Sequence, residues 1–529
     1  MRKAKTLARS GLWSILLSLP VGAATCDGLA SLKLANASIT AADVVAAGSF
    51  VPPGRGPNPA ALALYKSLPA FCRVQGLAQP SSDSHIEFEV WLPVAGWNGK
   101  YMGVGNGGSA GSITYTYTPN AHGLANALMA GFAASSTDTG HRGAGDDYSF
   151  GKDHPEKAID YFYRAIHETA IHAKAIVQAF YGADAKYSYF DSCSNGGREA
   201  LMEVQRYPAD YNGVLAGAPS NFRTRLQLEM VWVSEALSAE PGSHFPAAKL
   251  PAIEAATLAA CDARDGLKDG VIDEPSKCKF DPSVLLCKGP ENDACLTQPQ
   301  VTALQKIYSG PHTSKGAQIL PGYEPGGETG VANAWASWIT GTDTRQGSSS
   351  VRAEGFFASF LPPDPRWNVQ NFNFDRDVKA FDDSPAALAN ATNPDLSSFR
   401  DRGGKLILYH GWSDAAVPPL ATVNYYRQVQ SKMGPKTGEF SRLYMVPGMQ
   451  HCGGGPGPNS FREPITTALE RWVESGTAPD RIVATKYKMD GNPSSGAMRT
   501  RPLCPYPQVA HYNGSGSIDD AANFTCRIP

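Results

Sequence analysis

Residues 187–208 read YSYFDSCSNGGREALMEVQRYP: a short apolar run, a sharp turn of small residues and an amphipathic stretch that ends before Pro208. Similar apolar runs, each followed by a loop, recur at 405–419 (KLILYHGWSDAAVPP) and 440–452 (FSRLYMVPGMQHC). Buried strands that alternate with amphipathic helices are typical of a sheet whose strands run in parallel. The sequence therefore predicts an α/β fold with a mostly parallel sheet flanked by helices.

The first third of the chain fits the same pattern. Residues 85–104 alternate apolar and polar side chains around a turn, which predicts strands and a hairpin. The glycine-rich sequence GNGGSAG follows at 105–111, and residues 160–181 have the periodicity of an amphipathic helix.

The middle of the chain differs from both ends. From about residue 221 to residue 390 strand patterns are few, whereas tryptophan, proline, glycine and serine are frequent. We interpret residues 221–390 as an inserted lid domain. Residues 25–220 and 391–529 would form the first and second parts of one core.

The N-terminus has the features of a secretory signal. Arg2 and Lys3 open a basic segment, residues 12–21 are apolar, and Gly22-Ala23-Ala24 is a small-residue cleavage site. We predict a signal peptide at 1–24 and a secreted or periplasmic protein. We expect no membrane span, because no stretch reaches about 18 apolar residues. A membrane or lipid anchor at this end stays open.

Ten cysteines in an exported chain favour disulfides. Spacing suggests three local pairs and one that holds the mature N-terminus, and it leaves one distant pair. The pairs are Cys261–Cys278, Cys287–Cys295, Cys504–Cys526, Cys26–Cys72 and Cys193–Cys452. The net charge of −2 gives no reason to expect a nucleic-acid partner.

Ser194 lies in a frame close to the nucleophile elbow Gly-x-Ser-x-Gly, with Ser192 in place of the first glycine. In α/β-hydrolases an acid and then a histidine follow the nucleophile along the chain. Asp414 and His451 each come after a predicted strand, where catalytic side chains of open parallel sheets lie. We predict a Ser194–His451–Asp414 triad on an α/β-hydrolase core. His410 is an alternative base, although it more readily fits a structural role.

An oxyanion hole needs two N–H donors. The residue after the nucleophile, Asn195, supplies one, and we assign the other to Gly107 in the early glycine-rich loop. Cys193 precedes Ser194 and Cys452 follows His451. If the triad forms, a Cys193–Cys452 disulfide would fix the serine relative to the histidine. A thiol enzyme that uses Cys193 is a weaker alternative, and it predicts activity that depends on reductant.

These motifs together resemble the tannase and feruloyl esterase family, which includes mono(2-hydroxyethyl) terephthalate hydrolases. The resemblance rests on Cys-Ser-x-Gly-Gly at 193–197, the late aspartate, the His-Cys step at 451–452, TDTGH at 137–141 and the cysteine pattern. It implies a hydrolase core, a lid that carries substrate specificity and the Cys193–Cys452 disulfide.

The segment CDARDGLKDGVIDE at 261–274 places four aspartates in one short loop, where their charges repel without a cation. Their spacing differs from that of an EF-hand. The resemblance implies a structural Ca²⁺ here and no organic cofactor. Its implied ligands are the Asp262, Asp265 and Asp269 carboxylates and the Leu267 and Val271 carbonyls. Asp273 would support them, and a solvated acidic turn is the alternative.

The lid is rich in aromatic side chains, which suit a planar aromatic acid. We expect substrate contacts from Trp338, Phe356 and Arg352, with Arg345 as a second arginine able to bind a carboxylate. The expected substrate is a small ester of a feruloyl or galloyl acid, attached in nature to plant cell-wall polysaccharide or tannin. A terephthalate monoester is the alternative substrate. An inactive binding protein on a hydrolase fold is the alternative class.

Overall fold

The fold is built on one nine-stranded sheet. The computed structural model describes residues 23–53, 59–330, 334–342, 347–361, 369 and 371–529. Residues 1–22 of the predicted signal segment and Arg345 lie outside this part. The strand order is β1-β2-β3-β5-β4-β6-β7-β8-β9. The strands are β1 (Ala37–Val45), β2 (Phe71–Ala78), β3 (Ile86–Pro93), β4 (Lys100–Val104), β5 (Ala133–Thr137), β6 (Tyr187–Cys193), β7 (Gly213–Gly217), β8 (Lys405–Gly411) and β9 (Ser441–Val446).

The six strands from β5 to β9 in this order are parallel, and β1, β2 and β3 extend the sheet as antiparallel strands. Successive residues of the central strands face opposite layers, as the period of two requires. In β8, Leu406 and Leu408 belong to one buried cluster, whereas Ile407 and Tyr409 belong to another. Both faces of the sheet are therefore covered, which explains the nearly continuous apolar strands.

Each face of the sheet has its own set of helices. One buried cluster contains residues of α4 (Ala165–Tyr181), α5 (Asn195–Arg206) and α13 (Pro419–Met433). The other contains residues of α2 (Leu124–Met129) and α14 (Arg462–Ser475). The shorter helices α1 (Pro59–Ser67), α3 (Pro155–Ile159) and α12 (Ser397–Asp401) complete the layers. The predicted helix at 160–181 begins with a π-helical turn over Asp160–Arg164 and continues as α4.

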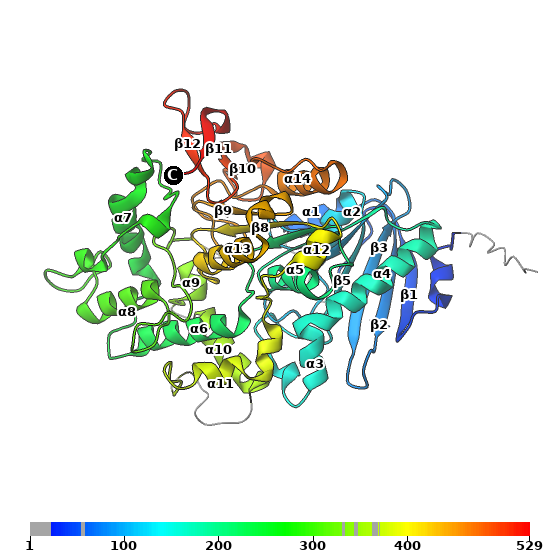
Figure 1. The fold of residues 1–529 in the computed structure, drawn as a ribbon, viewed down its shortest axis with the longest axis horizontal. Coiled ribbons are helices and arrows are strands. Elements are labelled where there is room, and N and C mark those ends of the chain that lie inside the picture. Colours follow the sequence, from blue (N-terminus) through cyan, green and yellow to red (C-terminus); the bar gives the residue numbers. More distant parts are fainter. Residues whose placement is uncertain (1–22, 54–58, 331–333, 343–346, 362–368, 370) are drawn as a thin grey trace, which may run out of the picture.

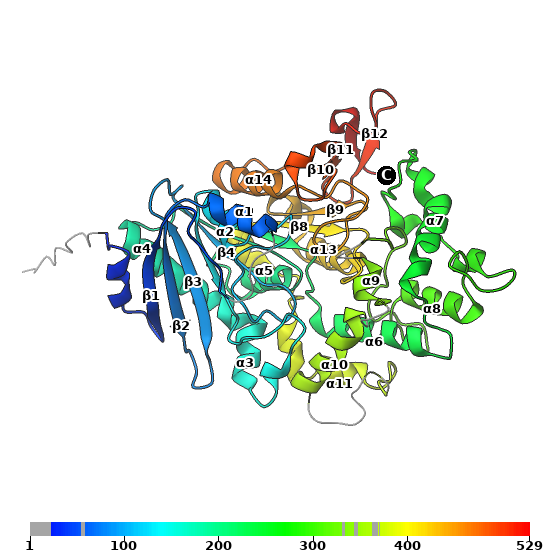
Figure 2. The same cartoon turned by 180° about the vertical axis from the view of Figure 1, so that it is seen from behind.

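The chain leaves the sheet after β7 and returns to it at β8. The intervening helices are α6 (Arg223–Ser238), α7 (Leu250–Cys261), α8 (Gln298–Ser309), α9 (Trp335–Trp338), α10 (Ser348–Phe360) and α11 (Val378–Asp382). They contribute to two aromatic-rich buried clusters, which also include residues from both parts of the core. Figures 1 and 2 both show α7 and α8 at the opposite end of the molecule from β1. This is the segment that we interpret as the lid.

The predicted hairpin at 85–104 is wrong, although both of its strands form. The structure places β5 between β3 and β4, so these two strands are not neighbours. After β3 the chain therefore skips the neighbouring place in the sheet, which β5 later fills, and forms β4 in the next one. Alternation along each strand is the same in both arrangements, so it cannot reveal which strand is the partner.

The last fifty residues form two small antiparallel pairs beside the main sheet (Figure 1). They are β10 (Ile482–Tyr487) with β11 (Ala497–Leu503), and β12 (Val509–Tyr512) with β13 (Phe524–Arg527). All ten cysteines form the five pairs expected from their spacing. Within the described part of the chain, no helix combines the length and the apolarity that a membrane crossing requires.

Candidate active site

Ser194 occupies the sharp turn between β6 and α5, with backbone angles φ 66° and ψ −124°. A non-glycine residue at such angles is strained and is held there by its surroundings. The turn needs small neighbours, because a Cβ added to Gly196 would lie 1.8 Å from Ser192 Oγ, and one added to Gly197 would lie 2.2 Å from Gly217 O. The side chain of Ser192 fits in this turn because residue 196, which faces its Oγ from the start of α5, is a glycine without a Cβ.

Three predicted residues meet at this turn. Ser194 Oγ lies 2.9 Å from His451 Nε2, and His451 Nδ1 lies 2.8 Å from Asp414 Oδ2. Ser194 follows β6, Asp414 follows β8 and His451 follows β9, so the ends of three parallel strands supply the three side chains, with β7 between β6 and β8. Ser194 is half-buried, while the other two are buried. This is the order and spacing of a nucleophile, a base and an orienting acid.

Asp414 is held as a carboxylate. Its Oδ1 accepts hydrogen bonds from the N–H groups of Ala416 and Val417, at 2.7 and 2.9 Å. Burial alone would raise the pKa of Asp414, but the adjacent His451 and His410 outweigh it and hold that pKa below its usual range. The acid is therefore ionised, as is needed to stabilise a positive charge on His451.

His410 is not placed to act as the base. Its Nε2 contacts Asp414 Oδ2 at 3.0 Å, and its Nδ1 contacts Thr422 Oγ1 at 2.7 Å. The side chain is fully buried, and its hydrogen bonds link the acid to α13. The alternative assignment of His410 as base is therefore corrected to a structural role.

The disulfide Cys193–Cys452 joins the residue before the serine to the residue after the histidine, with the two Cα atoms 6.0 Å apart. Tyr117 donates a hydrogen bond from its hydroxyl to the Cys193 carbonyl at 2.7 Å. Cys193 thus has no thiol in this structure, which removes the alternative of a thiol enzyme. The cysteine beside the nucleophile fixes the geometry of the turn.

The glycine-rich loop after β4 lies next to the start of α5. Asn106 N donates to Glu199 Oε2 at 2.9 Å, and Asn195 Nδ2 donates to Glu199 Oε1 at 2.8 Å. A Cβ on Gly108, where φ is +61°, would lie 2.1 Å from Gly145 O. The loop therefore follows a path that requires glycine. The roles of Gly107 and the Asn195 N–H as oxyanion donors stay predictions.

A buried polar network lies behind this loop and was not predicted from the sequence. Arg198 donates from Nε to Asn195 Oδ1 at 2.8 Å, and Tyr161 donates to Gly108 O at 3.1 Å. Burial raises the pKa of Glu199 to about 7. The Arg198 charge and the hydrogen bonds from the Asn106 main chain and the Asn195 side chain oppose this rise. The signal was present, because Arg198 and Glu199 lie on a helix that packs against the sheet.

Two of the predicted lid contacts lie near the triad. The Trp338 ring is 5.2 Å from the His451 ring at an angle of 74°, and the Arg352 guanidinium lies 5.1 Å from the Trp338 ring centre. Both side chains are half-buried. Arg352 Nη1 donates to Gly145 O at 2.6 Å, whereas its buried Nε has no partner among the residues described.

The predicted substrate contact of Phe356 is wrong for this structure. Its side chain is fully buried where the lid meets the first part of the core, and it packs against Tyr148, Phe360 and Phe381. The sequence placed it one helical turn after Arg352, but it belongs to the core of α10 and α6. An aromatic residue on such a helix serves packing first.

The acidic loop contains the five residues that were assigned to calcium. The Asp262 carboxylate accepts from the N–H groups of Asp269 and Gly270, and the Asp265 carboxylate accepts from those of Leu267 and Asp273. Asp269 Oδ2 faces two cations from β11, with Arg499 Nη1 at 3.0 Å and Arg501 Nη2 at 2.6 Å. Val271 is buried beside the loop.

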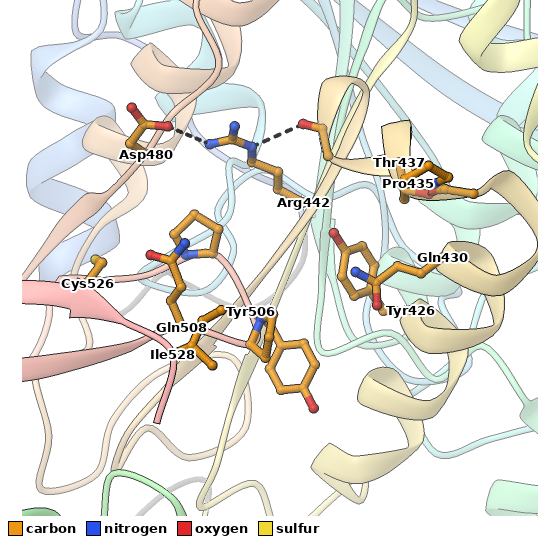
Figure 3. A pocket seen from close by; sticks show the side chains of 14 residues that line it. Tyr426, Gln430, Pro435, Thr437, Arg442, Asp480, Tyr506, Gln508, Cys526 and Ile528 are labelled. Carbon is orange, nitrogen blue, oxygen red and sulfur yellow. Dashed lines mark hydrogen bonds and ion pairs between the residues drawn. The ribbon is translucent and has the colours of Figure 1, made fainter.

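A cavity of about 770 Å³ lies between α13, β9 and the C-terminal strand pairs. Figure 3 shows Arg442 paired with Asp480 at one wall and Tyr506 and Gln508 at another. None of the triad residues lines it. Because the triad lies outside this cavity, the cavity is not the reaction site, although it is large.

Comparisons with known proteins agree with this geometry. Residues 72–527 match the family described as "Tannase and feruloyl esterase". An uncharacterized esterase from Xanthomonas campestris pv. campestris is 41% identical over 99% of this chain and 94% of that protein. The mono(2-hydroxyethyl) terephthalate hydrolase of Piscinibacter sakaiensis is 36% identical over 89% of this chain and 87% of that protein.

The crystal structure of feruloyl esterase B from Aspergillus oryzae superimposes with a TM-score of 0.81 at 28% identity, covering 95% of this chain and 99% of that one. The fold is that of an α/β-hydrolase. The chain belongs to the tannase and feruloyl esterase family and is a carboxylic ester hydrolase.

Proposed function

We propose that this protein is an exported serine esterase that hydrolyses esters of feruloyl-type or galloyl acids through an acyl-enzyme on Ser194. The hydrogen-bonded series Ser194–His451–Asp414 is the observation that carries the proposal. Five disulfides support export, since such bonds persist in oxidising compartments.

The proposed mechanism has two halves. His451 Nε2 takes the proton from Ser194 Oγ as the oxygen attacks the ester carbonyl, and then gives it to the leaving alkoxide. Water next attacks the acyl-enzyme with the same histidine as base, which releases the acid and restores the serine. Asp414 holds the Nδ1–H tautomer throughout, and the N–H groups of Asn195 and Gly107 are proposed to bind the oxyanion.

An aromatic acyl group suits the position of Trp338. Its ring lies against His451, so an acyl group on Ser194 would have an aromatic surface beside it. Attachment of the substrate to plant cell-wall polysaccharide or tannin remains part of the proposal, because relatives of this chain are named feruloyl esterases and a structural neighbour is a tannin acyl hydrolase.

A terephthalate monoester is the second candidate substrate, and Arg352 is the observation that favours it. A terephthalate monoester carries a free carboxylate on the far side of its ring. Arg352 lies over Trp338, and its guanidinium supplies a positive charge there that such a carboxylate would pair with. The relative from Piscinibacter sakaiensis is named for this activity.

A panel of esters separates these candidates. We expect wild type to hydrolyse methyl ferulate, methyl gallate or mono(2-hydroxyethyl) terephthalate, and Ser194→Ala to lose roughly 10⁴-fold or more in kcat. If terephthalate is the acyl group, Arg352→Gln lowers kcat/KM for the monoester about tenfold or more and spares the bis(2-hydroxyethyl) ester, which lacks the free carboxylate. Arg352→Lys keeps the charge and serves as the matched variant.

Each outcome of the panel has a meaning. Equal turnover by wild type and Ser194→Ala would contradict the serine mechanism. Tight binding of the acids without turnover of any ester would favour the alternative class, an inactive binding protein on this fold. If Arg352→Gln lost the hydrolysis of both terephthalate esters, the role of Arg352 would be to maintain the structure of the site and not to bind the free carboxylate.

We also propose that the acidic loop of the lid binds a structural Ca²⁺. Burial and the neighbouring Asp269 and Asp262 charges raise the pKa of Asp265, and burial with the Asp265 charge raises that of Asp273 to about 8. Among the described residues no three of these carboxylates yet lie within 4.8 Å of one another, so the loop would close around the ion as it binds. Asp262, Asp265 and Asp269 would supply carboxylate oxygens, and Leu267 and Val271 carbonyl oxygens. When bound, the ion would neutralise the loop.

A further inference from the structure

A second group of possible metal ligands lies in the core, away from both the triad and the acidic loop. It combines His167 of α4, Glu203 of α5 and Asp210 of the turn between α5 and β7. One ligand atom of each lies within 4.8 Å of the others, and His167 Nδ1 is 2.6 Å from Asp210 Oδ2. Three separate segments of the chain therefore converge on one point.

Glu203 is the residue that requires an explanation. Its side chain is 1% exposed, and neither carboxylate oxygen has a hydrogen-bond donor among the residues that the structure describes. Its carboxyl lies beside that of Asp210, with one oxygen of each within 4.8 Å of the other. A buried carboxylate is costly unless a proton or a cation compensates it.

The other charged and titratable groups around Glu203 do not provide this compensation directly. Lys174 of α4 donates its ammonium hydrogen bond to the main-chain oxygen of Asp210, and not to a carboxylate. Glu199 adds negative charge one helical turn away, while Tyr101 and Tyr211 are neutral neighbours. The group is open to ions on one side, because the His167 side chain is 24% exposed.

We propose that His167, Glu203 and Asp210 form a binding site for a divalent transition-metal ion. One imidazole nitrogen and two carboxylate oxygens suit Zn²⁺ better than Ca²⁺, which prefers six to eight oxygens. Water would complete the coordination from the exposed side. The ion would join α4, α5 and the following turn.

The site's role would be structural. Ser194 precedes the first residue of α5, and Glu203 is nine residues further along, which is roughly 13 Å at the rise of an α-helix. An ion at Glu203 therefore cannot touch an ester bound at the serine. It would instead stabilise the helix that begins at the nucleophile.

Metal content and thermal melting of the untagged full chain test the proposal. After chelation, incubation with Zn²⁺ and dialysis, we expect wild type to retain one zinc per chain and to melt at a higher temperature than the stripped protein. Glu203→Gln and His167→Gln should lose both effects. His511→Gln, which removes an exposed histidine on β12, should retain them. Millimolar Ca²⁺ should not displace the zinc.

Three results would overturn the proposal. The first is wild type that retains no zinc, and the second is equal retention by wild type and Glu203→Gln. The third combines two observations: zinc leaves the melting temperature of wild type unchanged, and metal-free Glu203→Gln melts at the same temperature as wild type. Glu203 would then be protonated and share that proton with Asp210, with no need for an ion. If Glu203→Gln does not fold, the partly exposed His167→Gln gives the same comparison. None of these readouts depends on ester hydrolysis.

Discussion

Glu199 connects the two segments that are proposed to bind the oxyanion. One oxygen of its carboxylate accepts from the Asn106 main chain, just before Gly107, and the other accepts from the Asn195 side chain. Both bonds need acceptor oxygens, which an ionised carboxylate supplies fully and a protonated one only in part. Because burial brings the pKa of Glu199 to about 7, its charge changes within the ordinary working range.

The pH dependence of hydrolysis should therefore contain a contribution from Glu199. Below about pH 7 the carboxyl gains a proton, the contact to the loop weakens and kcat falls. Glu199→Gln removes this ionisation and replaces one acceptor oxygen of the carboxylate by an NH₂ group. We therefore expect kcat of the variant at pH 8 to be about tenfold lower or more than that of wild type, with a smaller change in KM. The measurement is kcat against pH for both proteins.

Identical pH profiles for wild type and Glu199→Gln, differing by a constant factor at most, would contradict this account of Glu199. Glu240→Gln, at an exposed position on the lid, is the matched control for removing a glutamate charge. It should leave the profile unchanged.

Among the segments of the lid, the acidic loop should depend on calcium. Without the ion its carboxylates repel one another, although Asp269 pairs with Arg499 and Arg501 and the Arg501 charge also acts on Asp273. We expect excess chelator to lower the melting temperature by several degrees while it changes the initial rate at low temperature much less. Asp265→Asn should reduce the response to chelator. An unchanged melting curve, on protein shown to be free of metal, would exclude calcium from the loop.

Buried glutamates make the lid sensitive to alkali. Burial raises the pKa of Glu229 to about 8 and those of Glu254 and Glu324 to about 7. A carboxyl whose pKa is higher in the folded state stabilises the fold fully at pH values below its unfolded pKa. That stability is lost as pH rises through the folded value. The window runs from about pH 4.5 to about pH 8.

Thermal melting between pH 5 and pH 8 measures this effect. We expect the melting temperature of wild type to fall by a few degrees, and that of Glu229→Gln to fall less, because glutamine imitates the protonated side chain and keeps an acceptor for the Tyr323 hydroxyl. The exposed variant Glu240→Gln should follow wild type. A Glu229→Gln variant as pH-dependent as wild type would contradict the assignment.

At the level of elements, the sequence predicts which strands and helices form better than it predicts strand neighbours. The strands before Ser194 and before the Asp414 loop were predictable because each is an apolar run that ends in small or polar residues. The pairing of β3 with β5 was not, because the paired residues of the two strands lie more than forty positions apart in the sequence. The predicted substrate contact of Phe356 was wrong for a related reason, because helical periodicity does not show whether an aromatic side chain packs in the core or lines a substrate pocket.

At the scale of the whole molecule, the second part of the core reaches the first only after the long insertion. The Cys193–Cys452 disulfide closes this connection, with a sequence separation of 259 residues. Constraining so long a loop in the unfolded chain stabilises the fold by roughly 5 kcal/mol in the chain-entropy model. The candidate triad was readable from sequence because its members follow strands, whereas the partners of Glu199 and Glu203 emerge only when helices and loops are packed together.

Covalent labelling of the intact protein shows whether Ser194 is an activated nucleophile. A fluorophosphonate ester reacts with a serine only when a base and an oxyanion hole activate it. The account predicts one label per chain on the peptide that contains Ser194, with no label in Ser194→Ala and far slower labelling in His451→Ala. An unlabelled wild type, or a label on another residue with Ser194 unmodified, would contradict it.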